Sequence, residues 1–394
     1  MRWGVPVVAV AALAGAIGAG PVIAAVQGDP VLPERTAEQL LASAARAGTA
    51  EPKPMSGTVM QTASLGLPGL PDLTGMSGTS PAALLAGSHE LKVWYGGADK
   101  IRLAMPGRMS ETDLIVNGDQ VWLWQSDVNK ATRVTADGAE KAGEHGPARR
   151  AHEALPATTP QQLARTLLER VGRDTVVGVS STEKVADRAA YQLAFAPKDP
   201  SSLIREVKLA LDGETMVPLR VQVYAKSAAE PAFEVGFTSV TFSPPAAENF
   251  AFTPPAGAKV DQTSLGELTE KGRAGRDGFE DHERLGKKVK VVGSGWTTVA
   301  VLPVPEDLGA VAKPGQDAPA KDAGGQDVLG HNSPRQDATA IADALRKSAT
   351  PISGPWGSGQ VVRTKLVSAL LTDDGRLLVG AVTPERLVEA AGRK

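Results

Sequence analysis

The chain has 394 residues, 42% of them hydrophobic and 22% charged, which is an ordinary globular composition with room for a sizeable core and two domains. Its formal net charge of −2 gives no general electrostatic reason to expect nucleic acid as a partner, because nucleic-acid binders usually carry a basic excess or a basic cluster. With no cysteine, the chain can form no disulfide, offers no thiolate nucleophile and carries no cysteine-linked acyl anchor.

Residues 1–26 have the pattern of an export signal. One basic residue, Arg2, precedes an uncharged and mostly apolar run with small residues near its end. Val22-Ile23-Ala24 is an acceptable context for cleavage, whereas the uncut run reaches the roughly 20 residues that span a bilayer. With either outcome, we expect the rest of the chain outside the cytoplasmic membrane, secreted or held there by this segment.

The first helix is expected at residues 36–47, because Thr36 and Gln39 fit a capping box ahead of an apolar stripe. A strand is predicted at residues 56–65. Residues 66–88, with three prolines and five glycines, predict a long loop that packs on its own sheet, covers the cavity as a lid, or contacts a membrane or partner.

Residues 91–134 predict four short antiparallel strands. Asn117-Gly118 supplies the left-handed residues of the strongest hairpin turn. Alternation places Leu91, Val93 and Tyr95 on one face of the first of these strands and Trp94 on the other. Since both faces carry apolar groups, something apolar should cover each of them.

A second helix is predicted from Thr159-Pro160 to Gly172, with Thr159 and Gln162 as its capping box. From residue 176 to 242 the strands resume with one apolar inner face and one polar outer face. About ten strands in all are near the limit for an open sheet, so the sheet should curl around the two helices.

After residue 260 the composition changes. Residues 261–288 are expected to be a charged linker, and residues 305–337 a low-complexity loop within a C-terminal region, residues 289–394. That region predicts strands at 289–292, 296–302, 360–371 and 376–382, and helices at 338–347 and from Thr383. It forms either a small α+β extension or a continuation of the first sheet.

Several segments in this order resemble the LolA-like family, which includes outer-membrane lipoprotein carriers and periplasmic regulators of the RseB/MucB type. The segments are KIRL and VNGDQVWLW in residues 100–124, RAAYQLAFAPKD (188–199), REVKLALDGETMVPLRVQVY (205–224) and FEVGFTSVTF (233–242). The resemblance covers about residues 35–256 and implies an α+β domain, residues 27–260, built as a curved, incomplete antiparallel β-barrel. Helices would cover its inner face and leave an apolar cavity.

The candidate cavity residues combine the alternation with this resemblance. The tryptophans at 94, 122 and 124 either pack as core or line the cavity. For Arg102, the resemblance implies a contact that holds a lid closed. The alternative is that Arg102 is an outward-facing strand residue without such a role. No role is assigned to Val235. The apolar candidates are Trp94, Trp122, Trp124, Ile115, Leu209, Leu211 and Val221.

Nothing in the sequence predicts catalysis, a metal site or a cofactor. No G-x-S-x-G or P-loop pattern occurs, and the histidines lack the spacing of a helical zinc site. They are His89, His145, His152, His282 and His331.

The expected function is therefore non-enzymatic binding of lipid or lipoprotein acyl chains by a monomeric carrier. The alternatives are an envelope sensor that regulates an anti-sigma factor or another membrane protein through the C-terminal region, and a structural envelope protein with a filled core.

Overall fold

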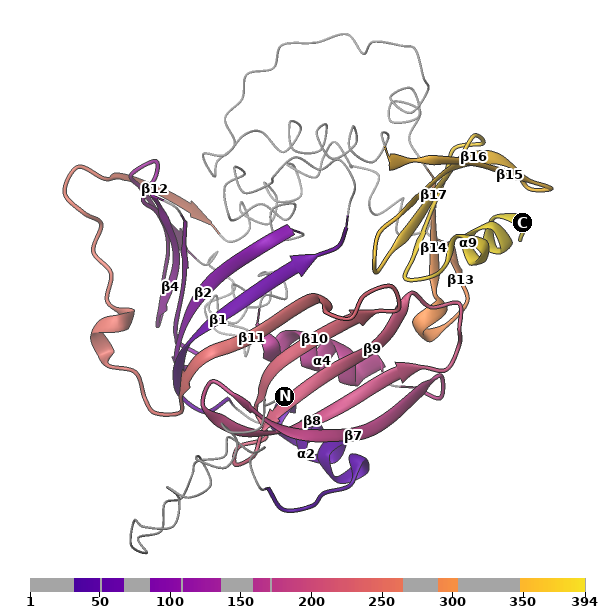
Figure 1. Ribbon diagram of the computed structural model, residues 1–394. Coiled ribbons are helices and arrows are strands. Elements are labelled where there is room, and N and C mark those ends of the chain that lie inside the picture. The colour runs from indigo at the N-terminus through magenta and orange to yellow at the C-terminus, as the bar shows by residue number, and fades with distance from the viewer. Residues whose placement is uncertain are drawn as a thin grey trace, which may run out of the picture.

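The computed structural model describes residues 32–49, 52–66, 86–107, 109–135, 159–170, 172–264, 290–303 and 348–393 (Figure 1). The expected export signal, the low-complexity loop and the helix at 338–347 lie outside the described residues, as do most of the loop at 66–88 and of the charged linker. His145, His152, His282 and His331 also lie outside them.

The main body is a twelve-stranded sheet in the order β12-β6-β5-β4-β3-β2-β1-β11-β10-β9-β8-β7. Only β12 and β6 pair in parallel; the other neighbours in this sheet are antiparallel. The strands are β1 (Met55–Ser64), β2 (Ala86–Gly97), β3 (Lys100–Pro106), β4 (Glu111–Asn117), β5 (Gln120–Gln125), β6 (Lys130–Thr135), β7 (Thr175–Val185), β8 (Arg188–Pro197), β9 (Ile204–Asp212), β10 (Pro218–Ala225), β11 (Pro231–Thr241) and β12 (Lys259–Ser264).

The sheet is curved and does not close into a barrel, and the fold class is α+β, as the sequence predicts (Figure 1). Twelve strands replace the ten expected. One added strand is β6, a fifth strand at the end of the stretch 91–134, where four were expected. The other is β12, which continues past residue 260, where the core was expected to end. Residues 86–88, expected in a loop, begin β2. The predicted hairpin turn at Asn117-Gly118 is present, and Gly118 has φ of 60°.

Two helices, α2 (Ala37–Thr49) and α4 (Pro160–Arg170), pack on one face of the sheet, here called the inner face. Both predicted capping boxes are formed. In α2, the Thr36 amide donates to Gln39 Oε1 at 3.0 Å and the Gln39 amide donates to Thr36 Oγ1 at 3.3 Å. Leu40 and Ala44 follow on the buried side of the helix. None of the helices in the described ranges is long and apolar enough to cross a membrane.

Thr36→Ala is expected to lower the free energy of unfolding by about 1 kcal/mol, because it removes the acceptor of the Gln39 amide. Ser43→Ala, in the middle of the same helix, should change it by less than about 0.5 kcal/mol. Urea unfolding followed by circular dichroism measures both variants. Equal losses would show that the cap does not stabilise the helix.

The C-terminal part forms a separate antiparallel sheet in the order β13-β14-β18-β17-β16-β15. This arrangement decides between the two alternatives, because the region does not continue the first sheet. The predicted strand at 360–371 is two strands separated by a turn. The elements are β13 (Lys290–Val292), β14 (Val299–Pro303), β15 (Thr350–Gly354), β16 (Gly357–Arg363), β17 (Ser368–Thr372), β18 (Arg376–Gly380) and helix α9 (Pro384–Gly392).

The two sheets are joined by backbone hydrogen bonds near the start of β9 and the end of β1. The Leu203 amide donates to the Ala381 carbonyl at 2.9 Å, and the Lys365 amide donates to the Leu65 carbonyl at 2.7 Å. Leu366 is buried against Ala225 and Ala232 of the large sheet. The C-terminal sheet is therefore attached to the large sheet at more than one place.

Candidate functional site

A continuous apolar surface runs along the inner face of the large sheet. Strand register aligns its side chains across neighbouring strands: Leu193 lies opposite Leu209, which lies opposite Val221, which lies opposite Val235. These residues form one core cluster with Leu40 and Ala44 of α2 and Ala164 of α4. Further members are Leu91, Val93, Tyr95, Ile101, Leu103, Val116, Val121, Val134, Phe195, Val207, Leu211, Leu219 and Phe237.

The described helices do not cover this surface evenly. Helix α4 packs mainly on β10 and β11, whereas α2 contacts β7 and α4. On β4 and β5, Leu114 and Leu123 face each other across the strands on the inner face and are only half-buried. Leu114 and Leu123 are therefore apolar inner-face side chains on strands that are not the main contacts of α2 and α4.

The sequence candidates are divided between the two faces. Leu209, Leu211 and Val221 belong to the buried inner face, and so does Val235. Trp94, Ile115, Trp122 and Trp124 share the opposite face, here called the outer face, with Arg102. The alternation therefore grouped the tryptophans correctly with one another, but the structure does not bring them together with the leucines.

On the outer face, two tryptophans and two arginines share one row of paired residues with Ile115. Trp94 lies opposite Arg102, Arg102 opposite Ile115, Ile115 opposite Trp122, and Trp122 opposite Arg133. The Arg102 guanidinium lies 5.4 Å from the centre of the Trp94 ring, and that of Arg133 lies 5.9 Å from the Trp122 ring. Such cation–π contacts stabilise the row and give both rings a packing partner within the chain.

A segment between β11 and β12, residues 243–258, crosses the outer face; it is here called the strap. Phe250 is 2% exposed and lies against Gly96, while the Phe252 ring lies 5.5 Å from that of Trp122 and 6.0 Å from that of Trp124. At its far end, the Asn129 side-chain amide donates to the Gly257 carbonyl at 3.0 Å. The apolar cover that the sequence required for this face therefore includes two phenylalanines of the strap.

Beside the tryptophan row, Asp113 is a buried carboxylate with few partners. It is 2% exposed, and Arg102 Nη2 donates to its Oδ2 at 2.7 Å. Its Oδ1 and the Nε of Arg102 are buried without a hydrogen-bond partner among the described residues. Burial raises the pKa of Asp113 to about 6, since the opposing effect of Arg102 is smaller. Arg102 thus contacts an acidic neighbour on its own sheet face, and its assigned contact with a lid stays a prediction.

A second buried carboxylate, Asp212, accepts hydrogen bonds on both of its oxygens. Burial acts to raise its pKa, but hydrogen bonds from Arg188 and Thr215 together hold the pKa below its usual value. Arg188 donates from both Nε and Nη2, and Thr215 donates from its amide at 2.8 Å and its hydroxyl at 2.7 Å. Asp212 therefore fixes the β9–β10 turn, whereas Asp113 has protein partners on one oxygen only.

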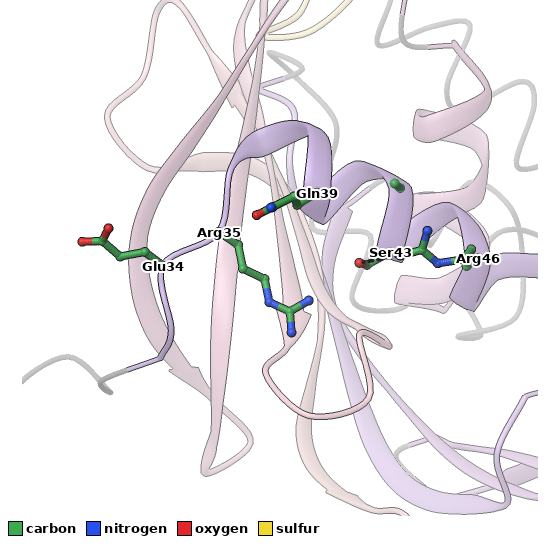
Figure 2. Close-up of a pocket in the computed structure, with 6 residues that line it drawn as sticks. Glu34, Arg35, Gln39, Ser43 and Arg46 are labelled. Carbon is green, nitrogen blue, oxygen red and sulfur yellow. Dashed lines mark hydrogen bonds between the residues drawn. The ribbon is translucent and has the colours of Figure 1, made fainter.

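A shallow surface groove lies along the exposed side of α2 and the residues before it (Figure 2). Arg46 donates to the Ser43 hydroxyl at 3.2 Å, and the Arg35 guanidinium lies 5.6 Å from the centre of the Tyr191 ring. The groove is lined by Glu34, Arg35, Gln39, Ala42, Ser43 and Arg46. Because its basic side chains already have partners within the chain, it is a weaker candidate than the inner face.

Among the described residues, no group of three or more His, Cys, Asp or Glu side chains is placed to hold a metal ion. The sequence analysis did not identify Asp113, Phe250 and Phe252. The two Pro-Pro pairs within the strap, at 244–245 and 254–255, were the available signal, because neither pair can belong to a central strand.

Comparison with known proteins gave solved structures only; no family model and no curated protein matches the chain. A chain of the Pseudomonas aeruginosa MucA/MucB complex matches with 14% identity and a TM-score of 0.37, covering 90% of this chain and 96% of that one. A LolA superfamily protein from Nitrosomonas europaea matches with 13% identity and a TM-score of 0.21, covering 56% and 99%. A putative outer membrane lipoprotein-sorting protein domain from Vibrio parahaemolyticus matches with 12% identity and a TM-score of 0.21, covering 54% of this chain and 96% of that one. These are the groups that the sequence motifs resemble, and at such low similarity they carry no information on ligand or partner.

Proposed function

We propose that the protein binds lipid, or the acyl chains of lipoproteins, on the inner face of its curved sheet, and that it does so without catalysing a reaction. The observation that carries this proposal is the continuous apolar inner face, whose half-buried leucines on β4 and β5 lie away from the main helix contacts. The protein would act outside the cytoplasmic membrane, where the pattern of residues 1–26 would place it.

The proposed acyl surface is centred on the half-buried Leu114 and Leu123, and the buried Leu209, Leu211 and Val221 belong to the core that continues from it across the inner face. Burying a chain of about 16 carbons contributes on the order of 10 kcal/mol, at about 0.8 kcal/mol per CH₂. A membrane offers the lipid nearly the same gain. A carrier therefore needs a closely fitted surface or direct transfer of its cargo from a partner.

Native mass spectrometry with lipid extraction tests the proposal on protein that a related bacterial host has exported. We expect co-purified lipid on the parent protein and its loss from the double variant Leu114→Asn, Leu123→Asn. The matched control is Trp122→Phe with Trp124→Phe, which changes the outer face of the same strand and should retain lipid. Circular dichroism checks that both variants fold.

Two results would contradict the inner-face proposal. One is a bare parent protein that also takes up no fluorescent fatty acid. The other is loss of lipid from the tryptophan variant alone, which would place the ligand on the outer face with Trp94 and Ile115.

A sensor that regulates a membrane protein is the second candidate, favoured by the C-terminal sheet attached to the large sheet through Leu203, Lys365 and Leu366. A sensor should capture its membrane partner differently in the lipid-loaded and the delipidated state. A carrier should transfer lipid to acceptor vesicles without such a partner. Crosslinking of the full chain in both states, beside a vesicle-transfer assay, separates the two functions.

A further inference from the structure

Helix α9 covers one face of the C-terminal sheet. Leu387 and Ala390 of α9 form one core cluster with Leu370 of β17 and Leu378 of β18. Among the described helices, α9 is the one whose main contacts lie on this sheet, and those contacts are with β17 and β18. Since these two strands lie in the middle of the sheet, α9 covers the centre of this face, here called the α9 face.

The opposite face of the same sheet, here called the second face, is also apolar. Strand register aligns two rows of side chains on it. The first row is Val291, Ala300, Val379, Ala369 and Val362, and the second is Leu302, Leu377, Leu371, Gln360 and Pro351. All of them are half-buried or exposed, and only Gln360 is polar. A sheet face in water normally carries polar side chains, so these rows indicate that something apolar covers the second face.

The chain itself has to cross this sheet between β14 and β15. Strand β14 ends at Pro303 and β15 begins at Thr350, and β18, β17 and β16 lie between them in the sheet. Because every neighbouring pair is antiparallel, β14 and β15 run parallel to each other. Parallel strands need a crossover connection over one face of their sheet, usually with a helix in it. Residues 304–349 make this connection.

The position of α9 favours one of the two faces for the crossover. On the α9 face, the connection would have to pass outside α9, which already lies over the two central strands. It would then leave the apolar rows of the second face bare. The second face offers the connection both a direct path and an apolar surface to pack on.

The last part of the connection has the pattern of a helix with one apolar side. Residues 338–347 are the predicted helix, and Ser348, the described residue that follows, is helical. Asp343 and Lys347 would lie on the polar side of this helix. Only Ala349 separates Ser348 from β15, so the end of the helix has to lie close to β15. The apolar side consists of Ala338, Ile341, Ala342 and Leu345.

We propose that residues 338–348 form a helix that packs its apolar side on the second face of the C-terminal sheet, as part of the crossover from β14 to β15. The sheet then has a helix on each face and leaves no apolar face open. A membrane partner of the sensor function would have to bind at the edges or loops of this sheet. The packing does not depend on whether the inner face of the large sheet holds lipid.

Pairs of introduced cysteines test the proposal in the full exported chain, because the chain has no cysteine of its own. Val361 and Val362 are neighbours on β16 and both are half-buried, but Val361 belongs to the α9 face and Val362 to the second face. Leu345→Cys with Val362→Cys should form a disulfide at least about tenfold faster than Leu345→Cys with Val361→Cys, since cysteines on opposite faces cannot meet.

Mild oxidation in native buffer, followed by free-thiol titration and peptide mapping, measures both rates. In urea the two pairs should react alike, because their separations along the chain differ by one residue. This comparison shows that the faster rate comes from the fold.

Alkylation of a single cysteine gives a second test that needs no disulfide geometry. Val379→Cys lies on the second face and should react slowly with iodoacetamide. Adding Ile341→Glu should raise the rate at least about fivefold, because a carboxylate on the apolar side of the helix opposes burial. Thr339→Glu is the matched control, since it adds the same charge on the polar side of the helix. It should leave the rate unchanged.

The proposal is overturned if the cysteine pair with Val361→Cys forms its disulfide as fast as the pair with Val362→Cys. It is also overturned if Val379→Cys reacts equally fast with and without Ile341→Glu. Protection of Val379→Cys that grows with protein concentration would overturn it as well, because a second copy of the chain would then cover the second face.

Discussion

Phe250→Ala is expected to lower the free energy of unfolding by about 3–5 kcal/mol, the range for removing a buried phenylalanine. Phe250 is 2% exposed and lies against Gly96, and between residues 243 and 256 the described strap has backbone hydrogen bonds only within itself. The ring is therefore the main attachment of the strap to the middle of the outer face. Urea unfolding followed by circular dichroism measures the loss.

Phe252→Ala is the matched control, because this ring is only half-buried on the same segment. It should cost less than Phe250→Ala but change the fluorescence of Trp122 and Trp124, whose rings it contacts. Equal costs for the two variants, or a loss below about 1 kcal/mol for Phe250→Ala, would show that the strap is held elsewhere.

The contribution of Asp113 to the stability of the protein is expected to fall as the pH rises from about 4 to about 6. Burial raises the pKa of this carboxyl to about 6 in the folded protein, whereas its usual value is 3.8. Between these values, the folded state binds more protons than the unfolded state, so protonation stabilises the fold. The contribution is complete below pH 4 and is lost above pH 6, with a slope of at most about 1.4 kcal/mol per pH unit.

Asp113→Asn should remove this slope while keeping the size of the side chain. Asp127→Asn, on the exposed β5–β6 turn, is the matched control and should keep the slope. Urea unfolding at half-unit steps from pH 4 to pH 7 measures all three proteins. A parent protein whose stability changes with pH in the same way as that of the Asp113→Asn variant would contradict the assignment.

The features that the sequence predicted well are local ones. The two capping boxes and the Asn117-Gly118 turn depend on residues that are close together in the sequence, and all three form as expected. The two faces of each strand were also separated correctly, because alternation fixes them independently of the tertiary structure.

What could not be predicted depends on residues that are distant in the chain. The parallel pairing of β12 with β6 has no local signal, since Asn129 and Gly257 are 128 residues apart. The burial of Asp113 depends on its surroundings in the folded sheet, and its sequence neighbours do not reveal it. Strand β15 was missed because it is short and contains Pro351, which is typical of an edge strand and not of a central one.

The strand order also sets the order in which the large sheet can form. Strands β2–β6 and β7–β11 each pair with their neighbours in sequence, so both groups can form early from local contacts. The pairing of β1 with β11 joins residues as far apart as Ser56 and Thr241, and the pairing of β6 with β12 joins Lys130 to Lys259. Closing such long loops costs more chain entropy and is slow.

Folding should therefore end with two late closure steps. If the chain emerges from an export channel with its N-terminus first, β1 emerges long before β11. The edge of β1 that pairs with β11 then stays unpaired until β11 has emerged. During that interval the half-formed sheet is open to aggregation, and a chaperone outside the membrane would act at this stage.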